Sequence, residues 1–202
     1  MLPLQRGLES LGDLLAEERL QADLVVIGGG ALLLRGELVR PTADLDVVAR
    51  FEHGVLEASE PLPEPLVRAV RRVGAALGLS HFPRDEKDWL NAGPSYLLTM
   101  GLPDGFEDRL TARTFGALTI RIASRLDLIA LKFLAASDPQ RGQRRAIDLA
   151  DLLRIAPTHE EIVHALRWCM RVDGRPDFLK LDAAPLLDQL GIDATPFLEE
   201  LQ

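Results

Sequence analysis

The sequence predicts an α+β protein, in which a mixed sheet with flanking helices is followed by a C-terminal helical part. Two observations lead to this prediction. Short apolar or alternating segments typical of strands lie before residue 123, whereas the segments after Ser124 show helical spacing. The 202 residues are enough to bury a sizeable core. We therefore expect an α+β domain over residues 1–123 and a helical part over residues 124–202 packed on it.

The elements of the first part follow from apolar spacing and from helix breakers. Leucines recur at helical spacing over residues 3–20, which predicts an amphipathic helix. Residues 51–63 hold two prolines and are expected to form a loop. The other expected elements are a strand at 25–27, a glycine turn at 28–30, a helix from 31, a strand ending near 50, a helix at 64–77 closed by Gly78, an irregular segment at 81–93 with one helical turn at 85–91, a strand at 95–100, and a hairpin of 111–113 with 117–123.

Helices are expected throughout the second part. Ser124 and Thr158 precede two of these segments, and both are good N-cap residues. The expected helices are 125–136, 141–155 and 158–171, with shorter ones near 183–190 and 195–201.

The composition indicates a globular protein of the cytoplasm. Hydrophobic residues make up 47% of the chain, and the longest apolar run is too short and too broken to span a bilayer. The N-terminus shows no secretory signal. A single cysteine, Cys169, excludes an internal disulfide and a cysteine-based zinc cage. The net charge of −8 argues against broad capture of nucleic acid, and the arginines clustered at 68–72 and 141–145 fit either local polyanion patches or solvated helix faces.

The first candidate site lies in residues 25–48. Three glycines, Gly28, Gly29 and Gly30, follow a buried strand and leave backbone N–H groups uncovered at a helix N-terminus, where a phosphate is favoured. Asp44 and Asp46 alternate with apolar residues, so in a strand their carboxylates share one face, roughly 6 to 7 Å apart at the backbone. Carboxylates bind Mg²⁺ together with substrate phosphates. The segment therefore predicts metal-assisted chemistry on a nucleoside triphosphate.

Two other interpretations account for parts of this segment. A glycine turn after a strand also occurs in dinucleotide-binding folds, but Leu33 stands where the GxGxxG pattern needs its third glycine. The two aspartates alone fit the solvated face of an edge strand. The aspartates and the glycine turn together favour the phosphate and metal site.

Lys132 marks a second candidate site. It is one of three lysines among 23 basic residues, and it stands alone in the apolar helical segment LDLIALKFLAA. A buried ammonium group needs an anionic partner, and Asp148 and Asp151 are the candidates because they share one face of the next helix. The same three residues also fit an ion pair that only fastens two helices together.

The motifs around the first site resemble a known superfamily. The order of strand, GGGA, Arg40, Thr42, Asp44 and Asp46 is similar to the GG…RxTxDxD signature of the nucleotidyltransferase superfamily, in the branch of abortive-infection-type toxins and related uncharacterised bacterial proteins. That branch also has a DLxxxK-like helix followed by an RxKDxxDL helix. Here these segments read DLIALK and RAIDLADL, with Ile147 at the position of a basic residue.

The resemblance implies a mixed-sheet fold and a role for each candidate residue. In these roles, the triphosphate is held by Gly28, Gly29 and Gly30, and Mg²⁺ is held by Asp44 and Asp46. The strand and the phosphates are braced by Arg40 and Thr42. Phosphate charge is neutralised by Lys132, which is fixed by Asp148 and Asp151, or these two aspartates help to deprotonate the acceptor.

The implied reaction transfers a nucleoside monophosphate to a hydroxyl of a transfer RNA end or a protein side chain, with pyrophosphate as the leaving group. Enzymes of this superfamily usually carry a third metal-binding carboxylate on a later strand. The expected strand 95–100 offers only Thr99. This leaves two alternatives open: a site of two carboxylates with weak Mg²⁺ binding or lost activity, or a site that recruits a carboxylate from Asp104, Glu107 and Asp108 in the next loop. Two other functions stay open: a nucleotide-binding or regulatory module with little turnover, and the toxin half of a pair with an antitoxin.

Overall fold

The computed structural model describes residues 3–38, 42, 44–79 and 88–201, and it shows the α+β fold that the sequence predicts. The chain divides into two compact units. We call residues 1–102 with 106–124 the sheet unit, and residues 103–105 with 125–202 the helical unit.

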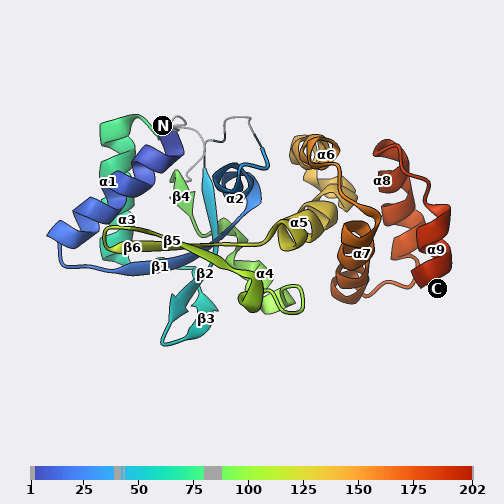
Figure 1. Ribbon diagram of the computed structural model, residues 1–202, viewed down its shortest axis with the longest axis horizontal. Helices are drawn as coiled ribbons and strands as arrows, with labels where there is room; N and C mark the ends of the chain where they lie inside the picture. The colour runs from blue at the N-terminus through green and yellow to red at the C-terminus, as the bar shows by residue number, and fades with distance from the viewer. Residues whose placement is uncertain (1–2, 39–41, 43, 80–87, 202) are drawn as a thin grey trace. The chain divides into compact units, whose positions relative to one another are not determined.

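The sheet unit contains a six-stranded mixed sheet among its described residues, in the order β3-β2-β1-β6-β5, with β4 paired to β2 (Figure 1). Strand β2 is antiparallel to β1 and β3 and parallel to β4, and β1 is parallel to β6. Strands β4 and β3 therefore lie beside the start and the end of β2, on the edge away from β1. The strands are β1 (Ala22–Ile27), β2 (Leu45–Glu52), β3 (Val55–Ala58), β4 (Leu90–Asn91), β5 (Thr111–Phe115) and β6 (Leu118–Ile122).

The sheet unit also contains helices that contact the sheet, and two of them, α1 and α3, lie side by side (Figure 1). Helix α1 also approaches the β5–β6 turn, where a Cβ at Gly12 would overlap the carbonyl oxygen of Phe115. Glycine therefore allows this close packing. The helices of the unit are α1 (Pro3–Glu17), α2 (Gly28–Arg35), α3 (Glu64–Leu77) and α4 (Tyr96–Met100), with 3₁₀ turns at Gly93–Ser95 and Glu107–Arg109.

Several expectations for the sheet unit are confirmed. Helix α3 ends at Gly78, which adopts the left-handed conformation with φ +65°. The β5–β6 hairpin forms, and the alternating residues Leu118, Ile120 and Ile122 of β6 are buried. The apolar period of two thus identifies a strand that turns one face to the core.

Other expectations are wrong. Residues 95–100 form the end of a 3₁₀ turn and helix α4 instead of a strand, since Pro94 starts a helical turn and SYLLTM lacks the alternation of a strand. Residues 51–63 are not all loop, because β2 continues to Glu52 and turns through His53 and Gly54, both at positive φ, into β3. Helix α2 begins at Gly28, without the expected glycine turn before it. Of segment 81–93, residues 81–87 lie outside the described part.

The helical unit contains the expected helices and one additional π-helical segment. Thr158 caps α7 in a capping box with Glu161, as its position predicts. The elements are α5 (Arg125–Ser137), α6 (Gln143–Ile155), α7 (His159–Asp173), the π-helical Leu179–Ala183, α8 (Ala184–Gln189) and α9 (Thr195–Leu201), with a 3₁₀ turn at Pro139–Arg141.

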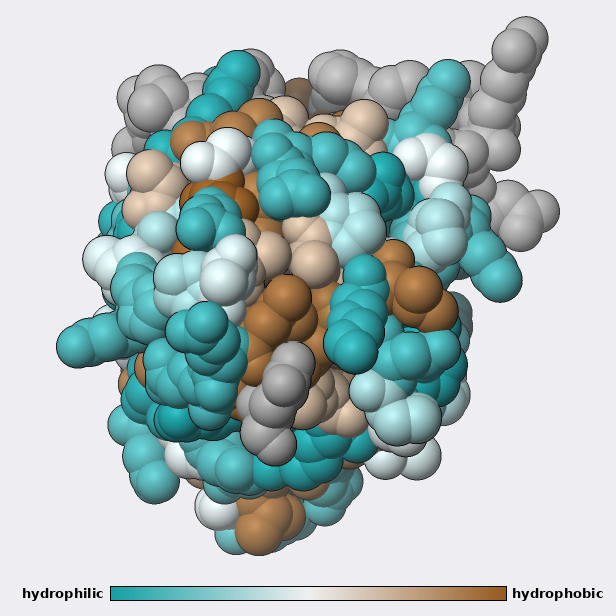
Figure 2. Space-filling view, turned by 90° about the vertical axis from the view of Figure 1, so that its right-hand side faces the viewer, coloured by the Kyte–Doolittle hydropathy of each residue, from teal (hydrophilic) through white to brown (hydrophobic). Residues whose placement is uncertain are grey.

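None of the helices formed by the described residues has the length and apolar character that a membrane span requires. The face shown in Figure 2 is hydrophilic over most of its area, with separate groups of hydrophobic side chains.

Candidate functional site

The start of helix α2 meets a carboxylate of strand β2. Strand β1 ends at Ile27 and α2 begins at the next residue, Gly28, with φ +74°. A Cβ built on Gly28 would lie 2.6 Å from Oδ2 of Asp46. An L-residue there would be strained in its backbone and would also collide with the carboxylate. Glycine thus brings the first turn of α2 directly against Asp46.

The three glycines differ in their surroundings. Gly28 and Gly29 are half-buried, whereas Gly30 is buried, and a Cβ on Gly30 would lie 2.8 Å from the carbonyl oxygen of Asp44. Gly30 therefore permits close packing of α2 on the start of β2. Ile27 has no side-chain acceptor and gives α2 no side-chain cap. The N-terminus of α2, with the positive end of its dipole, is thus suited to an anion.

A bulge decides which residue of β2 stands at this helix start. The pairing of β1 with β2 shifts between Val25 and Val26, so that Asp46 becomes the partner of Ile27. Without the shift, Val47 would occupy that position. The bulge therefore aligns Asp46 with the last residue before α2.

Asp44 lies just outside the strand. Strand β2 begins at Leu45, so Asp46 lies in it and Asp44 directly precedes it. Both aspartates are half-buried. Thr42 Oγ1 lies 3.4 Å from both Oδ1 and the backbone oxygen of Asp44, which is the long end of the hydrogen-bond range. Arg40, the other residue expected to brace this strand, lies outside the described residues.

A third carboxylate does not stand beside the aspartates on the described strands. Among the strands after β2, only β3 carries one, Glu57, which pairs with Arg50 near the far end of β2. Of the expected substitutes, Asp104 forms a 2.7 Å ion pair with Arg171 within the helical unit, while Glu107 and Asp108 begin a 3₁₀ turn of the sheet unit.

The Lys132 cluster forms in the helical unit as the sequence predicts. Lys132 on α5 is only 7% exposed, and its Nζ lies 2.6 Å from Asp148 Oδ1 and 2.8 Å from Asp151 Oδ2, both on α6. Arg141 contributes a second positive charge 3.9 Å from Asp148. These four charges balance one another, which allows the three buried groups to leave water.

The arginine clusters of the sequence are engaged in contacts within each unit. Arg68, Arg71 and Arg72 of α3 each approach a carboxylate, and Arg145 of α6 donates to the carbonyl oxygen of Ala136. These contacts favour the interpretation as helix faces over a strong polyanion patch.

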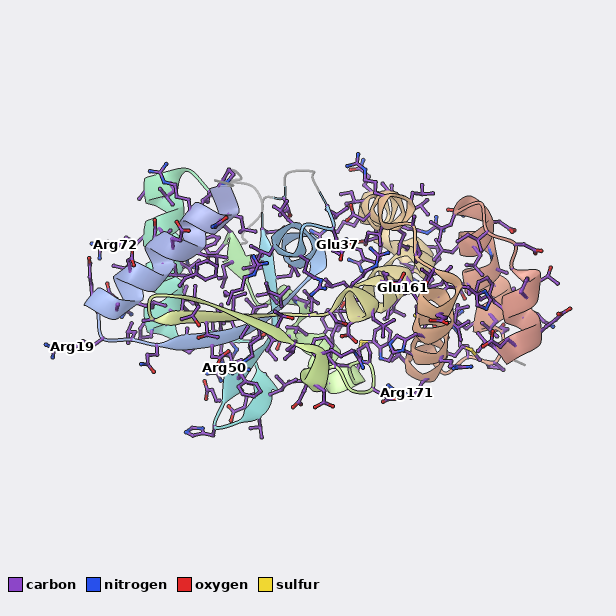
Figure 3. The ribbon with its side chains drawn as sticks, viewed as in Figure 1. Arg19, Glu37, Arg50, Arg72, Glu161 and Arg171 are labelled. Carbon is purple, nitrogen blue, oxygen red and sulfur yellow. The ribbon has the colours of Figure 1, made fainter. Side chains whose placement is uncertain are left out.

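One group of potential metal ligands was not expected from the sequence. His53 shows no metal-ligand spacing, yet the β2–β3 hairpin brings ligand atoms of Glu52, His53 and Glu57 within 4.8 Å of one another. Both glutamates also pair with Arg50, which is labelled in Figure 3. The pairing of the two strands, which the sequence did not reveal, creates this group.

Cys169 is unsuited to act as a nucleophile. It is fully buried on α7, and its Sγ lies 3.9 Å from the carbonyl oxygen of Ala130 on α5. Burial, followed by the charge of Asp173, raises the pKa of the thiol far above its usual range. The thiol therefore stays protonated.

Comparison with known proteins identifies the family. Residues 6–155, which include the α2 helix start and both aspartate pairs, match the family model described as "Nucleotidyltransferase of unknown function (DUF6036)". No curated protein and no solved structure matches the chain. The match covers well over half of the 202 residues, and the chain therefore belongs to this nucleotidyltransferase family.

Proposed function

We propose that the sheet unit binds a nucleoside triphosphate with Mg²⁺ and transfers its nucleoside monophosphate to a hydroxyl of an RNA or a protein. The observation that carries this proposal is the meeting of Gly28 with the Asp46 carboxylate. A helix N-terminus suits a phosphate and a carboxylate suits a hard cation, and here the two lie side by side. Membership in a nucleotidyltransferase family supports a nucleotide as the substrate.

The proposed roles follow from these positions. Backbone amides of Gly28 and Gly29 hold phosphate oxygens, while Gly30 allows the helix to approach the strand. Asp44 and Asp46 are the proposed ligands of Mg²⁺, which when bound neutralises charge on the phosphates. Thr42 orients Asp44, and Arg40 is proposed to contact the phosphates. Catalysis then consists mainly of positioning and charge neutralisation.

A role in the reaction is also proposed for the Lys132 cluster, and it rests on the resemblance of DLIALK and RAIDLADL to the toxin branch. Asp148 and Asp151 fix the ammonium through two of its three N–H groups. We propose that the third N–H donates a hydrogen bond to a phosphate oxygen. The alternative is that the ion pairs of Lys132 only fasten α5 to α6. The proposals that the protein belongs to the toxin branch and has an antitoxin partner rest on the same two motifs, DLIALK and RAIDLADL.

Calorimetric titration with each of the four nucleoside triphosphates, with and without Mg²⁺, tests the binding site. We expect Mg²⁺-dependent binding by the wild type and its loss in the double variant Asp44→Asn with Asp46→Asn, while circular dichroism stays unchanged. The matched control is Glu52→Gln with Glu57→Gln, which neutralises the other acidic group but should keep binding. Equal Mg²⁺-dependent affinity in the Asp44 and Asp46 variant would place the site elsewhere.

A second candidate function is nucleotide binding with little turnover. It is favoured by the described strands, which place no third carboxylate beside Asp44 and Asp46. A misplaced reacting atom costs about a hundredfold in rate, so we expect binding to be easier to detect than pyrophosphate release. Replacing Asp104, Glu107 and Asp108 with their amides should then slow any release further. Fast release by that triple variant would show that two aspartates suffice.

A further inference from the structure

An asparagine stands directly beside Asp46. Strand β4 contains only Leu90 and Asn91, and they pair in parallel register with Leu45 and Asp46 of β2. Paired residues of neighbouring strands point to the same face of a sheet, with backbones about 4.8 Å apart. The side chain of Asn91 therefore lies next to that of Asp46.

The position of Asn91 is held by its neighbours along the chain. The backbone N–H of Leu45 donates to the carbonyl oxygen of Trp89 at 2.7 Å, and the buried indole of Trp89 donates to the carbonyl oxygen of Val70 on α3 at 2.8 Å. On the other side of Asn91, Ser95 Oγ accepts from the backbone N–H of Ser59 at 3.0 Å. These contacts tie the segment around β4 to β2, α3 and the residue after β3.

The amide of Asn91 is satisfied at one end only. Its Oδ1 accepts from the backbone N–H of Gly93 at 3.0 Å, which fixes the orientation of the amide. Its Nδ2 is buried and has no hydrogen-bond partner among the described residues, and the residue is 8% exposed. A buried donor without an acceptor destabilises the folded state. Such a group in a folded protein calls for an explanation.

We propose that Asn91 is a positioning residue of the candidate site, whose Nδ2 donates to the Asp46 carboxylate when a divalent cation is bound. This inference rests on the proposed function. A carboxylate has acceptor sites for a metal and for a donor at the same time, and donors behind metal ligands orient them. Because Oδ1 already faces Gly93, the free end of Asn91 offers a hydrogen bond and not a metal ligand. The site thus has a neutral donor, Asn91, on the neighbouring strand. A carboxylate at that position would repel Asp46.

Selective labelling tests this proposal in the wild-type protein. Asn91 is the only asparagine in the chain, so labelling with ¹⁵N-asparagine gives a single side-chain NH₂ group in the NMR spectrum. We expect this signal to shift along the Mg²⁺ binding curve in the wild type and to stay in place in an Asp44→Ala, Asp46→Ala variant, which adds no further asparagine. If calorimetry detects no Mg²⁺ or nucleotide binding, the proposed function fails. Binding that leaves the Asn91 signal unmoved overturns only the role of Asn91.

A double-mutant cycle without any ligand tests the premise of the proposal, which is that the side chains of Asn91 and Asp46 are adjacent. Asn91→Asp keeps the acceptor for Gly93 but sets a carboxylate against Asp46, so we expect a lower melting temperature. Adding Asp46→Asn exchanges donor and acceptor across the two strands, and we expect it to restore most of that loss. An equal effect of Asn91→Asp in both backgrounds would show that the two side chains do not interact and would overturn the proposal.

Discussion

The two aspartate pairs of this protein show how burial separates structural carboxylates from carboxylates suited to a ligand. Asp148 and Asp151 are buried on a helix, and the ammonium of Lys132 lies within 2.8 Å of both. Asp44 and Asp46 are half-buried where strand β2 begins, and Asp46 meets the start of α2, whose N-cap residue Ile27 offers no side-chain acceptor. The charges of Asp148 and Asp151 are balanced by Lys132 within the helical unit, so removing either side of this ion pair leaves a buried charge without a partner charge. The second pair is partly exposed, and a cation and phosphates are proposed to bind there.

The largest expected effect comes from neutralising the buried pair, and the same change in the half-buried pair is its comparison. Asp148→Asn with Asp151→Asn leaves the Lys132 ammonium buried without a carboxylate, and we expect the free energy of unfolding to fall by about 3–5 kcal/mol. Asp44→Asn with Asp46→Asn should change it by less than about 1 kcal/mol, since both side chains are half-exposed. Urea unfolding measures both. A loss of equal size in the two variants would remove the distinction between the pairs.

Removing the buried charge should reverse part of the first effect. Lys132→Met added to Asp148→Asn, Asp151→Asn replaces a stranded ammonium by an apolar side chain of similar length, and we expect it to recover about 1–4 kcal/mol of the free energy of unfolding. The comparison with Lys132→Met alone, which strands two carboxylates, closes the cycle. Failure to recover would mean that Lys132 is stabilised by groups other than these two aspartates.

Substituting the two glycines at the ends of α2 distinguishes the effect of backbone strain from the effect of the contact with Asp46. Gly28 and Gly36 have φ of +74° and +77°, but a Cβ on Gly36 meets nothing within 4 Å. We expect Gly36→Ala to cost about 1 kcal/mol for its backbone alone and to leave nucleotide affinity unchanged. Gly28→Ala should cost more and weaken Mg²⁺-dependent nucleotide binding about tenfold or more. Thermal unfolding and calorimetry compare the two, and equal behaviour would count against the site at α2.

The smallest expected effect concerns pH and the helical unit. Glu161, labelled in Figure 3, pairs with Arg125 at 2.7 Å and caps α7 with Thr158. Burial raises the pKa of Glu161, but the hydrogen bonds from Arg125 and the Thr158 backbone outweigh it and lower the pKa overall. A lowered pKa means that the contribution of Glu161 to stability is present above about pH 4.3, the ordinary value, and is lost as the pH falls through the folded value.

Glu161→Gln should therefore flatten the acid side of the stability profile. The melting temperature, followed from about pH 7 to about pH 3, is expected to fall less steeply in this variant than in the wild type. Glu160→Gln, at the exposed neighbouring position, is the control and should follow the wild-type curve. Identical slopes for all three proteins would contradict a role of the Glu161 carboxylate.

Sequence spacing was enough to predict the longer helices, because a 3.6-residue apolar repeat is a local property of the chain, but it missed the five-residue helix α4. It also predicted the partners of Lys132, since a buried ammonium needs carboxylates and α6 offers two on one face. The short strands β3 and β4 could not be predicted. Two or four residues carry too little pattern, and each is a strand only because β2 pairs with it.

The sequence by itself determined that this chain carries a run of three glycines after a strand and two aspartates at strand spacing, which are the residue types that hold phosphate and a divalent cation. Only the tertiary structure decided which of these groups meet. The bulge at Val25 and Val26 aligns Asp46 with the start of α2, and the pairing of β4 with β2 adds Asn91 beside it. The physical reason is that strand register depends on hydrogen bonds between segments far apart in the chain, whereas residue spacing describes one segment at a time.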